Sequence, residues 1–355
     1  MSSDKTVLPP ALYALLSAIL FGASTPASKA LLGSISPQLL AGLLYLGSGL
    51  GLGLYLVVAK RINAVEPQQI LKRRDALWLA AAIACGGVAA PFLLMAGLKS
   101  TPASSASLLL NLEGVFTALL AWFAFKEHTD RRIVIGIIAI VLGSVVLAWT
   151  PGQGFAFSLG AGAIVGACFC WALDNNLTRN VSDADPTLIA AVKGLVAGTI
   201  NCLISIFTGS ALPPLTVALL AALVGFVSYG VSLSLFIKSL RLLGTARTGA
   251  YFSTAPFVGA VLSVLILQDR PNVNLLIAGV LMIVGVVLHL TEKHSHEHVH
   301  PAVEHDHAHT HDEHHIHEHG PNDPAGEPHS HPHGHAELRH SHPHYPDSEH
   351  RHEHD

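Results

Sequence analysis

The hydrophobic pattern of this chain consists of long apolar runs separated by short polar connections. Runs of roughly 20 residues have the length that crosses a bilayer core of about 30 Å. Helices of that length in a soluble protein would carry a charged face, and these runs do not. The pattern predicts ten transmembrane helices, at about residues 10–32, 38–59, 76–98, 103–125, 132–149, 156–177, 187–208, 215–238, 247–267 and 272–290.

The stretch 95–149 recurs 142 positions later, as 237–290, with matching residue classes and apolar runs of matching length. Glu127 aligns with Asp269, and each ends a span beside Arg or Lys, which favours an ion pair or an interface anchor there. Five helices per copy is an odd number, so the second copy must cross the membrane in the opposite direction. Such inverted repeats are typical of secondary transporters, which place their substrate site near the midplane where the halves meet. The identical aligned residues are few: Leu98, Ala118, Leu120, Ile135, Gly143 and Val145.

Charge divides the chain into a membrane body and a tail. The body up to Leu290 carries 17 Lys and Arg against 10 Asp and Glu, a balance of +7, whereas the remainder carries 3 against 14, a balance of −11 with histidine neutral. We therefore expect four parts: an N-terminal cytoplasmic segment (1–9), two five-helix repeats (10–149 and 150–290) and a tail (291–355).

The positive residues of the connections predict the orientation. With the N-terminus in the cytoplasm, the outside connections hold only Lys29, Lys99 and Arg270. Both termini, and with them the tail, are therefore expected in the cytoplasm. The inside connections hold Lys60, Arg61, Lys72, Arg73, Arg74, Lys126, Arg131, Arg132, Arg179, Arg241 and, near a helix end, Arg247.

The first repeat resembles the repeat of the EamA family in the drug/metabolite transporter superfamily. The matching features are Gly97-Leu98-Lys99, Leu112-Glu113, Glu127, Gly136 and Gly143, and in the second repeat Ala255-Pro256-Phe257, Asp269 and Gly285. The chain departs from the family pattern at Gly114, where a proline is usual, and at Ala255 and Asp269, where glutamates are usual. The resemblance implies an all-α membrane protein with ten helices in two inverted repeats, which exports or exchanges a small metabolite.

Glu113 is the most informative single residue, because it lies in the middle of an apolar run. A charged carboxylate there costs at least a few kcal/mol, so such a group faces the bundle interior, is paired, or is held neutral. It would either couple transport to protons or contact substrate, or it would join its helix to a neighbour by a structural hydrogen bond. Gly114 beside it would permit close helix approach or a local break.

Lys193 lies several residues inside the seventh span. It would pair with a substrate carboxylate, with Glu113 or with Asp174, or it would extend to the cytoplasmic headgroups. Asp174 and Asn175, near the cytoplasmic end of the sixth span, would line the pathway or simply end the helix. Tyr45 and Trp171 would face the cavity or the lipid.

Two prolines mark possible hinges. Pro26 interrupts the first span, and a proline within a span frees a carbonyl that must find another partner. Pro256 stands at the equivalent of Gly114 in the second repeat. We therefore expect hinge or packing positions at Pro26, Gly114 and Pro256.

The tail contains 22 histidines between His294 and His354 and almost no apolar residues, so we expect it to be disordered. Imidazole is a good ligand for Ni, Zn and Co, and a disordered chain can wrap around an ion. The tail would bind metal, would sense pH through protonation near pH 6.5, or would be a low-complexity segment without a selected role. The candidate ligands are His294, His296, His298, His300, His305, His307, His309, His311, His314, His315, His317 and His319.

No phosphate-binding loop, metalloprotease motif or nucleophile elbow occurs in the body, which argues against an enzyme or an ATP-driven pump. The first hypothesis is a secondary transporter of the inner or plasma membrane that exports a small metabolite, with lipid and substrate but no nucleic acid as partners. No cofactor is required. The alternative is efflux of a divalent transition metal (Ni, Co or Zn), with the tail as collector or sensor. A membrane metal sensor or scaffold without transport would leave the duplicated body unexplained.

Overall fold

The structure is a computed structural model that describes residues 9–61, 76–125, 131–150, 154–155, 158–178 and 185–290, together with four strand segments between 295 and 343. It divides into two units, Met1–Thr291 and Glu292–Asp355, which are described separately. Glu127, and the tail residues His294, His311, His314, His315, His317 and His319, lie outside the described residues.

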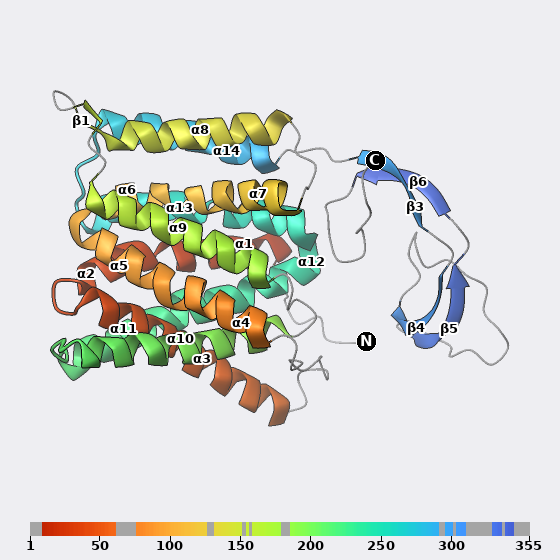
Figure 1. Cartoon of the computed structure of the whole chain (residues 1–355), viewed down its shortest axis with the longest axis horizontal. Coiled ribbons are helices and arrows are strands. Elements are labelled where there is room, and N and C mark those ends of the chain that lie inside the picture. Colours follow the sequence, from red (N-terminus) through yellow and green to blue (C-terminus); the bar gives the residue numbers. More distant parts are fainter. Residues whose placement is uncertain are drawn as a thin grey trace. The chain divides into compact units, whose positions relative to one another are not determined.

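The first unit is a bundle of helices, in which η marks a π-helical segment (Figure 1). A two-residue antiparallel ladder of β1 (Trp149–Thr150) and β2 (Gly154–Phe155) separates its halves. The first half contains α1 (Pro10–Gly22), α2 (Ser24–Leu31), α3 (Pro37–Arg61), α4 (Ala76–Ala82), η2 (Ile83–Ala89), α5 (Ala90–Ser100), α6 (Ala103–Leu109), α7 (Leu112–Phe125) and α8 (Arg131–Ala148). The second half contains α9 (Leu159–Thr178), α10 (Pro186–Phe207), α11 (Leu215–Gly225), η4 (Phe226–Val231), α12 (Ser232–Phe252), α13 (Ala255–Ile266) and α14 (Val273–Leu290).

Seven helical segments of the described chain are long and apolar enough to cross a membrane, and they coincide with the predicted spans 1 to 5, 7 and 8. The sixth predicted span corresponds to α9, and the last two correspond to shorter apolar helices, Ala255–Ile266 and Val273–Leu288. Many large apolar side chains on the outside of the bundle are exposed, which a soluble protein rarely tolerates over so wide an area. The body is therefore a multi-pass membrane protein.

Helix α12 departs from the prediction, because it continues through the connection expected between residues 238 and 247. The hydroxyls of Ser239 and Thr248 are nevertheless 3.1 Å apart, and both residues are buried. Nine residues of straight helix rise by about 13.5 Å, so these side chains could not meet unless the chain turned back between them. The expected reversal is therefore present, but it is made within a continuous helical element.

Prolines explain several of the interruptions. A proline has no N–H to bond the carbonyl four residues earlier. The interruption falls at that earlier residue in each case: α1 ends at Gly22, four before Pro26, and α12 ends at Phe252, four before Pro256. Pro91 leaves the Gly87 carbonyl in η2 without its helical donor, and the Asn201 side chain from α10 donates to it at 3.0 Å.

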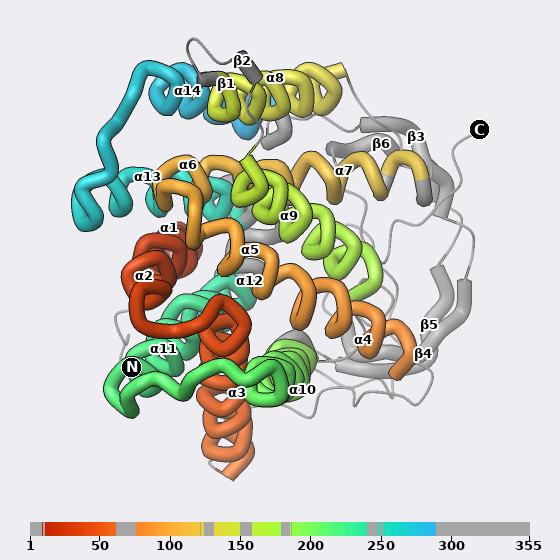
Figure 2. The backbone as a smooth tube through the Cα atoms, turned by 60° about the vertical axis from the view of Figure 1, so that its left-hand side comes forward, coloured from red at the N-terminus to blue at the C-terminus, as the bar shows by residue number. Residues whose placement is uncertain are grey.

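Equivalent helices of the two repeats pack against one another in antiparallel pairs, as inverted repeats require. Gly143 of α8 lies against Ala278 and Met282 of α14, while Gly285 of α14 lies against Gly136 and Ile140 of α8. Each of these contacts maps onto the other when 142 is added to or subtracted from its residue numbers. The pair α8–α14 lies at one side of the bundle and the pair α3–α10 at the other, with α6, α13, α1, α5 and α9 between them (Figures 1 and 2).

The tail contains two antiparallel ladders, and the prediction that it is disordered is not confirmed. Strand β3 (Ser295–His300) pairs with β6 (Leu338–Pro343), and β4 (Val303–His309) pairs with β5 (His329–His335). An extended backbone has unpaired N–H and C=O groups, and two such segments can satisfy them mutually without an apolar core. The composition alone could not show which distant segments would pair.

Candidate functional site

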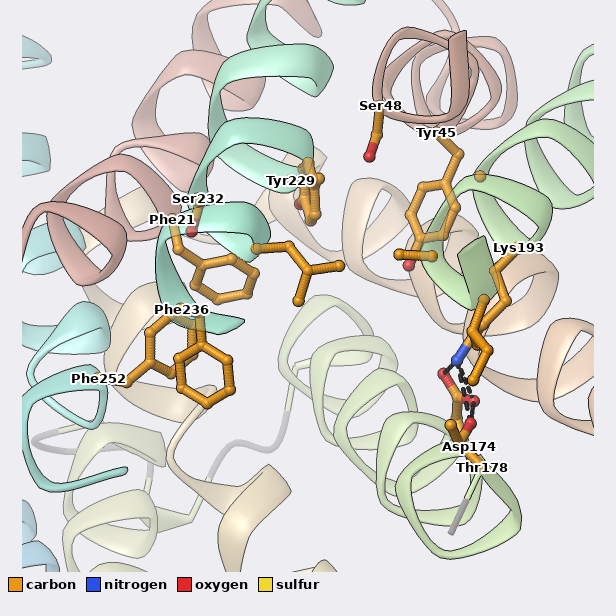
Figure 3. A pocket seen from close by; sticks show the side chains of 14 residues that line it. Phe21, Tyr45, Ser48, Asp174, Thr178, Lys193, Tyr229, Ser232, Phe236 and Phe252 are labelled. Carbon is orange, nitrogen blue, oxygen red and sulfur yellow. Dashed lines mark hydrogen bonds and ion pairs between the residues drawn. The ribbon is translucent and has the colours of Figure 1, made fainter. Parts of the chain in front are cut away.

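A cavity of about 430 Å³ lies between the two halves of the body. Phe21 on α1 and Tyr45 and Ser48 on α3 come from the first half, and the remaining lining comes from the second (Figure 3). The second-half residues are Asp174, Thr178, Ile189, Ala190, Lys193, Gly194, Tyr229, Ser232, Leu233, Phe236 and Phe252. The cavity thus lies where the repeats meet, as expected for an inverted-repeat transporter.

An ion pair forms one wall of the cavity. The Lys193 Nζ atom lies 2.5 Å from Asp174 Oδ1 and 2.7 Å from Oδ2, so the ammonium contacts both carboxylate oxygens. Thr178, one helical turn after Asp174, donates to Oδ1 at 2.9 Å and accepts from Lys193 at 3.2 Å. The side chains are only 9% exposed for Asp174 and 17% for Lys193, so each charge depends on the other.

The π-helical segment η2 holds the aromatic side chains beside this ion pair. The Gly86 carbonyl accepts from the Tyr45 hydroxyl at 3.0 Å and from the Trp171 indole at 3.0 Å. Gly86 also lies directly against the Asp174 side chain, where a Cβ atom would clash. The backbone distortion thus fixes Tyr45 and Trp171 and leaves room for Asp174.

A row of aromatic rings runs from the ion-pair side of the cavity to its opposite side. Tyr45 packs against Tyr229 with ring centroids 5.8 Å apart, and Tyr229 packs against Phe21 at 5.6 Å. Phe21 then packs against Phe252 at 5.3 Å, and Phe252 against Phe236 at 4.8 Å. Figure 3 shows the three phenylalanines on the side away from Lys193 and Asp174. The cavity therefore has a charged end and an apolar end.

Glu113 is not among the lining residues of this cavity. Its Oε1 atom accepts from the Asn175 side chain of α9 at 2.9 Å, and Asn175 also reaches the Thr117 hydroxyl at 3.4 Å. This is the helix-to-helix hydrogen bond that one of the two interpretations of Glu113 requires. A role in proton coupling stays a prediction.

The other predicted site residues divide between two positions. Lys193, Asp174 and Tyr45 line the cavity, and Trp171 is buried behind Tyr45 with its indole 3.4 Å from the tyrosine hydroxyl. Asn175 faces α7 and bonds Glu113. Asp174 and Asn175 are consecutive on one helix and so serve different neighbours.

Gly114 does not pack closely against another helix: a Cβ atom there would have nothing within 4 Å. The close-approach interpretation of this glycine is therefore wrong, because no atom of the described residues approaches the position of its Cβ. The local break is present instead just before it, between α6 and α7 at Leu110 and Asn111. The equivalent break in the second repeat lies between α12 and α13, before Pro256.

Polar contacts join helices at the end of the bundle away from the ion pair. Lys29 donates to the Leu98 carbonyl and, at 2.9 Å, to the Thr101 carbonyl. Asp269 accepts from both the backbone N–H and the hydroxyl of Ser104, each at 2.9 Å. Asp269 thus links α13 to the start of α6, a role that its position beside Arg270 did not suggest.

The sequence analysis missed the aromatic side of the cavity. Phe21 lies in α1, Tyr229 in η4, and Phe236 and Phe252 in α12, and the four have no common spacing. Aromatic residues also occur on the exposed surface, as Phe123 and Phe207 do, so residue type alone could not distinguish them. The repeat offered one signal. The segment equivalent to 83–89 in the second repeat is 225–231, which contains Tyr229, and Phe236 follows shortly after it.

Comparison with known proteins agrees with this architecture. The EamA-like transporter family matches twice, over residues 8–149 and 158–291. The chain belongs to the EamA-like transporter family. A solved protein structure with 20% identity shares the fold with a TM-score of 0.58, over 79% of this chain and 96% of the other.

Several proteins similar to this chain are named as transporters or as an efflux pump. An uncharacterized transporter of Methanothermobacter thermautotrophicus is 31% identical over 76% of this chain and 82% of its own length, and one of Bacillus subtilis is 26% identical over 76% and 89%. A probable amino-acid metabolite efflux pump of Salmonella typhimurium is 35% identical over 30% of this chain and 35% of its own length. The protein is a membrane transporter and not an enzyme.

Proposed function

We propose that the protein exports a small metabolite across the inner or plasma membrane as a secondary transporter, through the cavity between its repeats. The buried Lys193–Asp174 pair in the cavity wall is the observation that carries this proposal. Ionisable groups are expensive inside a membrane protein and commonly mark a substrate pathway. Both repeats contribute to the cavity, as a mechanism of alternating access would require.

The proposed orientation, with ten spans and both termini in the cytoplasm, would put the charged end of the cavity on the cytoplasmic side. Asp174 lies four residues before the end of α9 and Lys193 seven after the start of α10, which are the cytoplasmic ends in that orientation. On the opposite side, Lys29 and Asp269 join helices, and Gln38 donates to Asn201 at 2.5 Å. This conformation would accept substrate from the cytoplasm.

Transport measurements on the ion pair test this proposal. In inverted membrane vesicles, Asp174→Asn and Lys193→Gln should each reduce metabolite uptake at least about tenfold, because each leaves one charge unpaired. Lys238→Gln is the matched control, since Lys238 is exposed, stacks on Tyr13 and does not line the cavity. A metabolite panel on a deletion strain identifies the cargo. Transport at the normal rate in both cavity variants would contradict the proposal.

The cavity favours an organic substrate over a divalent metal. Among the described residues no group of three or more His, Cys, Asp or Glu side chains is placed to hold an ion. Asp174, the one carboxylate among the described lining residues, is already paired with Lys193. We therefore assign metal binding to the tail, as a separate property that requires no resident cofactor.

The pairing of the tail strands supports the proposal that the tail binds metal. In the β4–β5 ladder His305 is opposite His333, and His307 is opposite His331. Alternate residues of a strand share a face, and directly opposite positions have Cβ atoms about 4.5–5.5 Å apart. Histidines from segments more than 20 residues apart in sequence thus occupy neighbouring positions, and they could ligate Ni, Co or Zn together.

Calorimetry on the full-length protein tests the tail assignment. Replacing His329, His331 and His333 together by alanine should remove a large share of the Ni binding, although most of the tail histidines remain. Deleting residues 291–355 should remove nearly all of it. If the deletion also lowers tolerance of the cells to Ni, Co or Zn, then the metal is either the transported substrate or the signal that regulates transport. Unchanged Ni binding after the deletion would contradict the assignment.

A further inference from the structure

Three buried hydroxyl groups have no hydrogen-bond partner, and all belong to segments at the end of the bundle away from the ion pair. Among the side chains that the structure describes, they are those of Ser28 in α2, Thr101 between α5 and α6, and Ser107 in α6. Each oxygen is enclosed so completely that a water molecule could not contact it. A hydroxyl in this condition costs free energy, so its position requires an explanation.

Other buried serines of the body show that this cost can be avoided. A serine in a helix can bond a carbonyl of its own preceding turn, and Ser263 of α13 does so with Gly259 at 2.6 Å. Ser17 and Ser232, which are both buried, have their hydroxyls 3.1 Å apart and bond each other. The three unpartnered hydroxyls therefore depart from what the rest of this bundle does.

One of the three lies beside the segment of α1 that adjoins the cavity. A Cβ atom on Gly259 of α13 would lie 2.7 Å from both the Gly22 carbonyl oxygen and the Ser107 hydroxyl. Gly22 follows Phe21, which lines the cavity, and its carbonyl is the one that Pro26 leaves without a helical donor. Helices α1, α6 and α13 thus close on one another directly beyond the cavity wall (Figure 2).

Two charged side chains hold this region closed at its far end. Lys29 of α2 donates to the carbonyl groups of Leu98 and Thr101 at the end of α5. Asp269, which follows α13, accepts from the N–H and from the hydroxyl of Ser104 at the start of α6, each at 2.9 Å. The connection between α5 and α6 is therefore tied to α2 on one side and to the end of α13 on the other.

The backbone is strained where it presents Asp269. Gln268 has a φ of 55°, in the left-handed region that favours glycine. The chain reverses there, and the Asp269 N–H returns to the Ser263 carbonyl at 3.5 Å. A residue keeps such a conformation only when its surroundings hold it, and the two bonds to Ser104 contribute to that hold.

We infer that the contact between α2, α6 and α13 is the closed exit route of the cavity, with Lys29 and Asp269 as its latch. This inference rests on the proposed function and its orientation, and it adds the path by which cargo leaves. When these helices separate, the unpartnered hydroxyls become hydrated and line a polar route. Their cost in the closed state favours opening, and the latch bonds oppose it. We call this region the outer seam; it consists of Ser28, Thr101, Ser104, Ser107 and Gly259.

Thiol labelling of right-side-out vesicles tests the route. Ser107→Cys in the full-length protein is exposed to a membrane-impermeant methanethiosulfonate reagent, and mass spectrometry locates the label. We expect labelling at this position, at least about tenfold faster when Asp269→Ala removes both bonds to Ser104. Ser17→Cys, similarly buried in α1, is the matched control and should stay unlabelled, as should the buried native Cys168. No labelling of Ser107→Cys, or equal labelling of both positions, would overturn the inference.

A cross-link over the latch tests whether the route must open during transport. The Ser104 hydroxyl and the Asp269 carboxylate are 2.9 Å apart, so Ser104→Cys combined with Asp269→Cys places two thiols together. A short bifunctional methanethiosulfonate should lower export of the cargo found in the metabolite panel at least about tenfold, and dithiothreitol should restore it. Each single variant is the control and should respond little. Undiminished export by the cross-linked protein would overturn the inference.

The inference and the proposed function fail in different ways. If Ser107→Cys is never labelled from outside, but Asp174→Asn abolishes export, the outer seam is not the exit route and the transport proposal stands. If Asp174→Asn and Lys193→Gln export normally while Ser107→Cys is labelled, the proposed role of the cavity fails and the opening of the outer seam stands.

Discussion

Glu113 in the first repeat and Ala255 in the second occupy equivalent positions, but they make different contacts with the neighbouring helices. Glu113 accepts a hydrogen bond from Asn175 of α9 across a partly exposed contact. Ala255 is 1% exposed, and its carbonyl lies against Gly22 of α1, so closely that a Cβ atom on Gly22 would clash. One helix pair is joined by polar side chains and the other by close backbone packing.

The comparison shows that the duplication preserves the backbone and leaves the side chains free to diverge. The π-helical segments η2 and η4, the breaks before α7 and α13 and the α8–α14 contacts all recur at equivalent positions. The cavity does not recur in this way: its only described charged lining residues, Asp174 and Lys193, belong to the second half. The two halves therefore contribute different chemistry to the same cavity.

The largest effect is expected from copying the first repeat into the second. Ala255→Glu would place a carboxylate at a position that is 1% exposed, in a close contact between α13 and α1. We expect a loss of at least about 3 kcal/mol in the free energy of unfolding, or no folded protein. Thermal unfolding in detergent measures it. A variant as stable as the original would show that α1 and α13 can separate without cost.

Equivalent substitutions in the two symmetric contacts of α8 and α14 should lower the stability of the protein by similar amounts. Gly143→Leu and Gly285→Leu each insert a side chain between the same two helices, so we expect each to cost about 1–3 kcal/mol. Gly53→Leu is the control, because a Cβ atom there meets nothing within 4 Å. Unfolding midpoints that differ widely between the two variants would contradict the two-fold relation of this interface.

The two π-helical segments should differ in how much a side-chain hydrogen bond stabilises each of them. Asn201→Leu removes the donor to the Gly87 carbonyl in η2, which Pro91 cannot bond, and we expect a cost of about 1–3 kcal/mol. In η4 the Gly230 carbonyl accepts from Ser234 on the following turn, at 3.1 Å. Ser234→Ala should cost less, because the main-chain donor of a continuing helix remains available. The same unfolding measurement compares them.

The smallest effect is expected at Glu113. Glu113→Gln keeps an oxygen that can accept from Asn175, so we expect stability to change by less than about 1 kcal/mol and transport to fall less than about tenfold. Glu113→Ala, which removes the acceptor, should cost more. Complete loss of transport in stable Glu113→Gln protein would instead assign the coupling proton to this residue.

Prediction from sequence succeeded where local physics decides the outcome. The lengths of the apolar runs located the seven membrane-crossing segments and the duplication, because both depend only on composition and spacing along the chain. Prolines marked the breaks after Gly22 and Phe252, since a missing N–H acts four residues away whatever the surroundings are.

The candidate site was predictable only in part. Asp174 and Lys193 could be singled out because charges are costly in apolar runs, but several partners were open to each of them. Their pairing needed α9 and α10 to be neighbours with the right rotation. The aromatic side, with Phe21, Phe236 and Phe252, offered no comparable cost signal, because a phenylalanine is as acceptable against lipid as against a cavity.

The sequence by itself determined the membrane architecture, the repeat and the small set of intramembrane charges, because burial of apolar runs and exclusion of charge from lipid act on each segment separately. The tertiary structure alone decided that Lys193 meets Asp174, that Glu113 bonds Asn175 outside the cavity, and that Asp269 joins α13 to α6. These contacts join segments 19, 62 and 165 residues apart. Their existence depends on how whole helices pack, which no local pattern records.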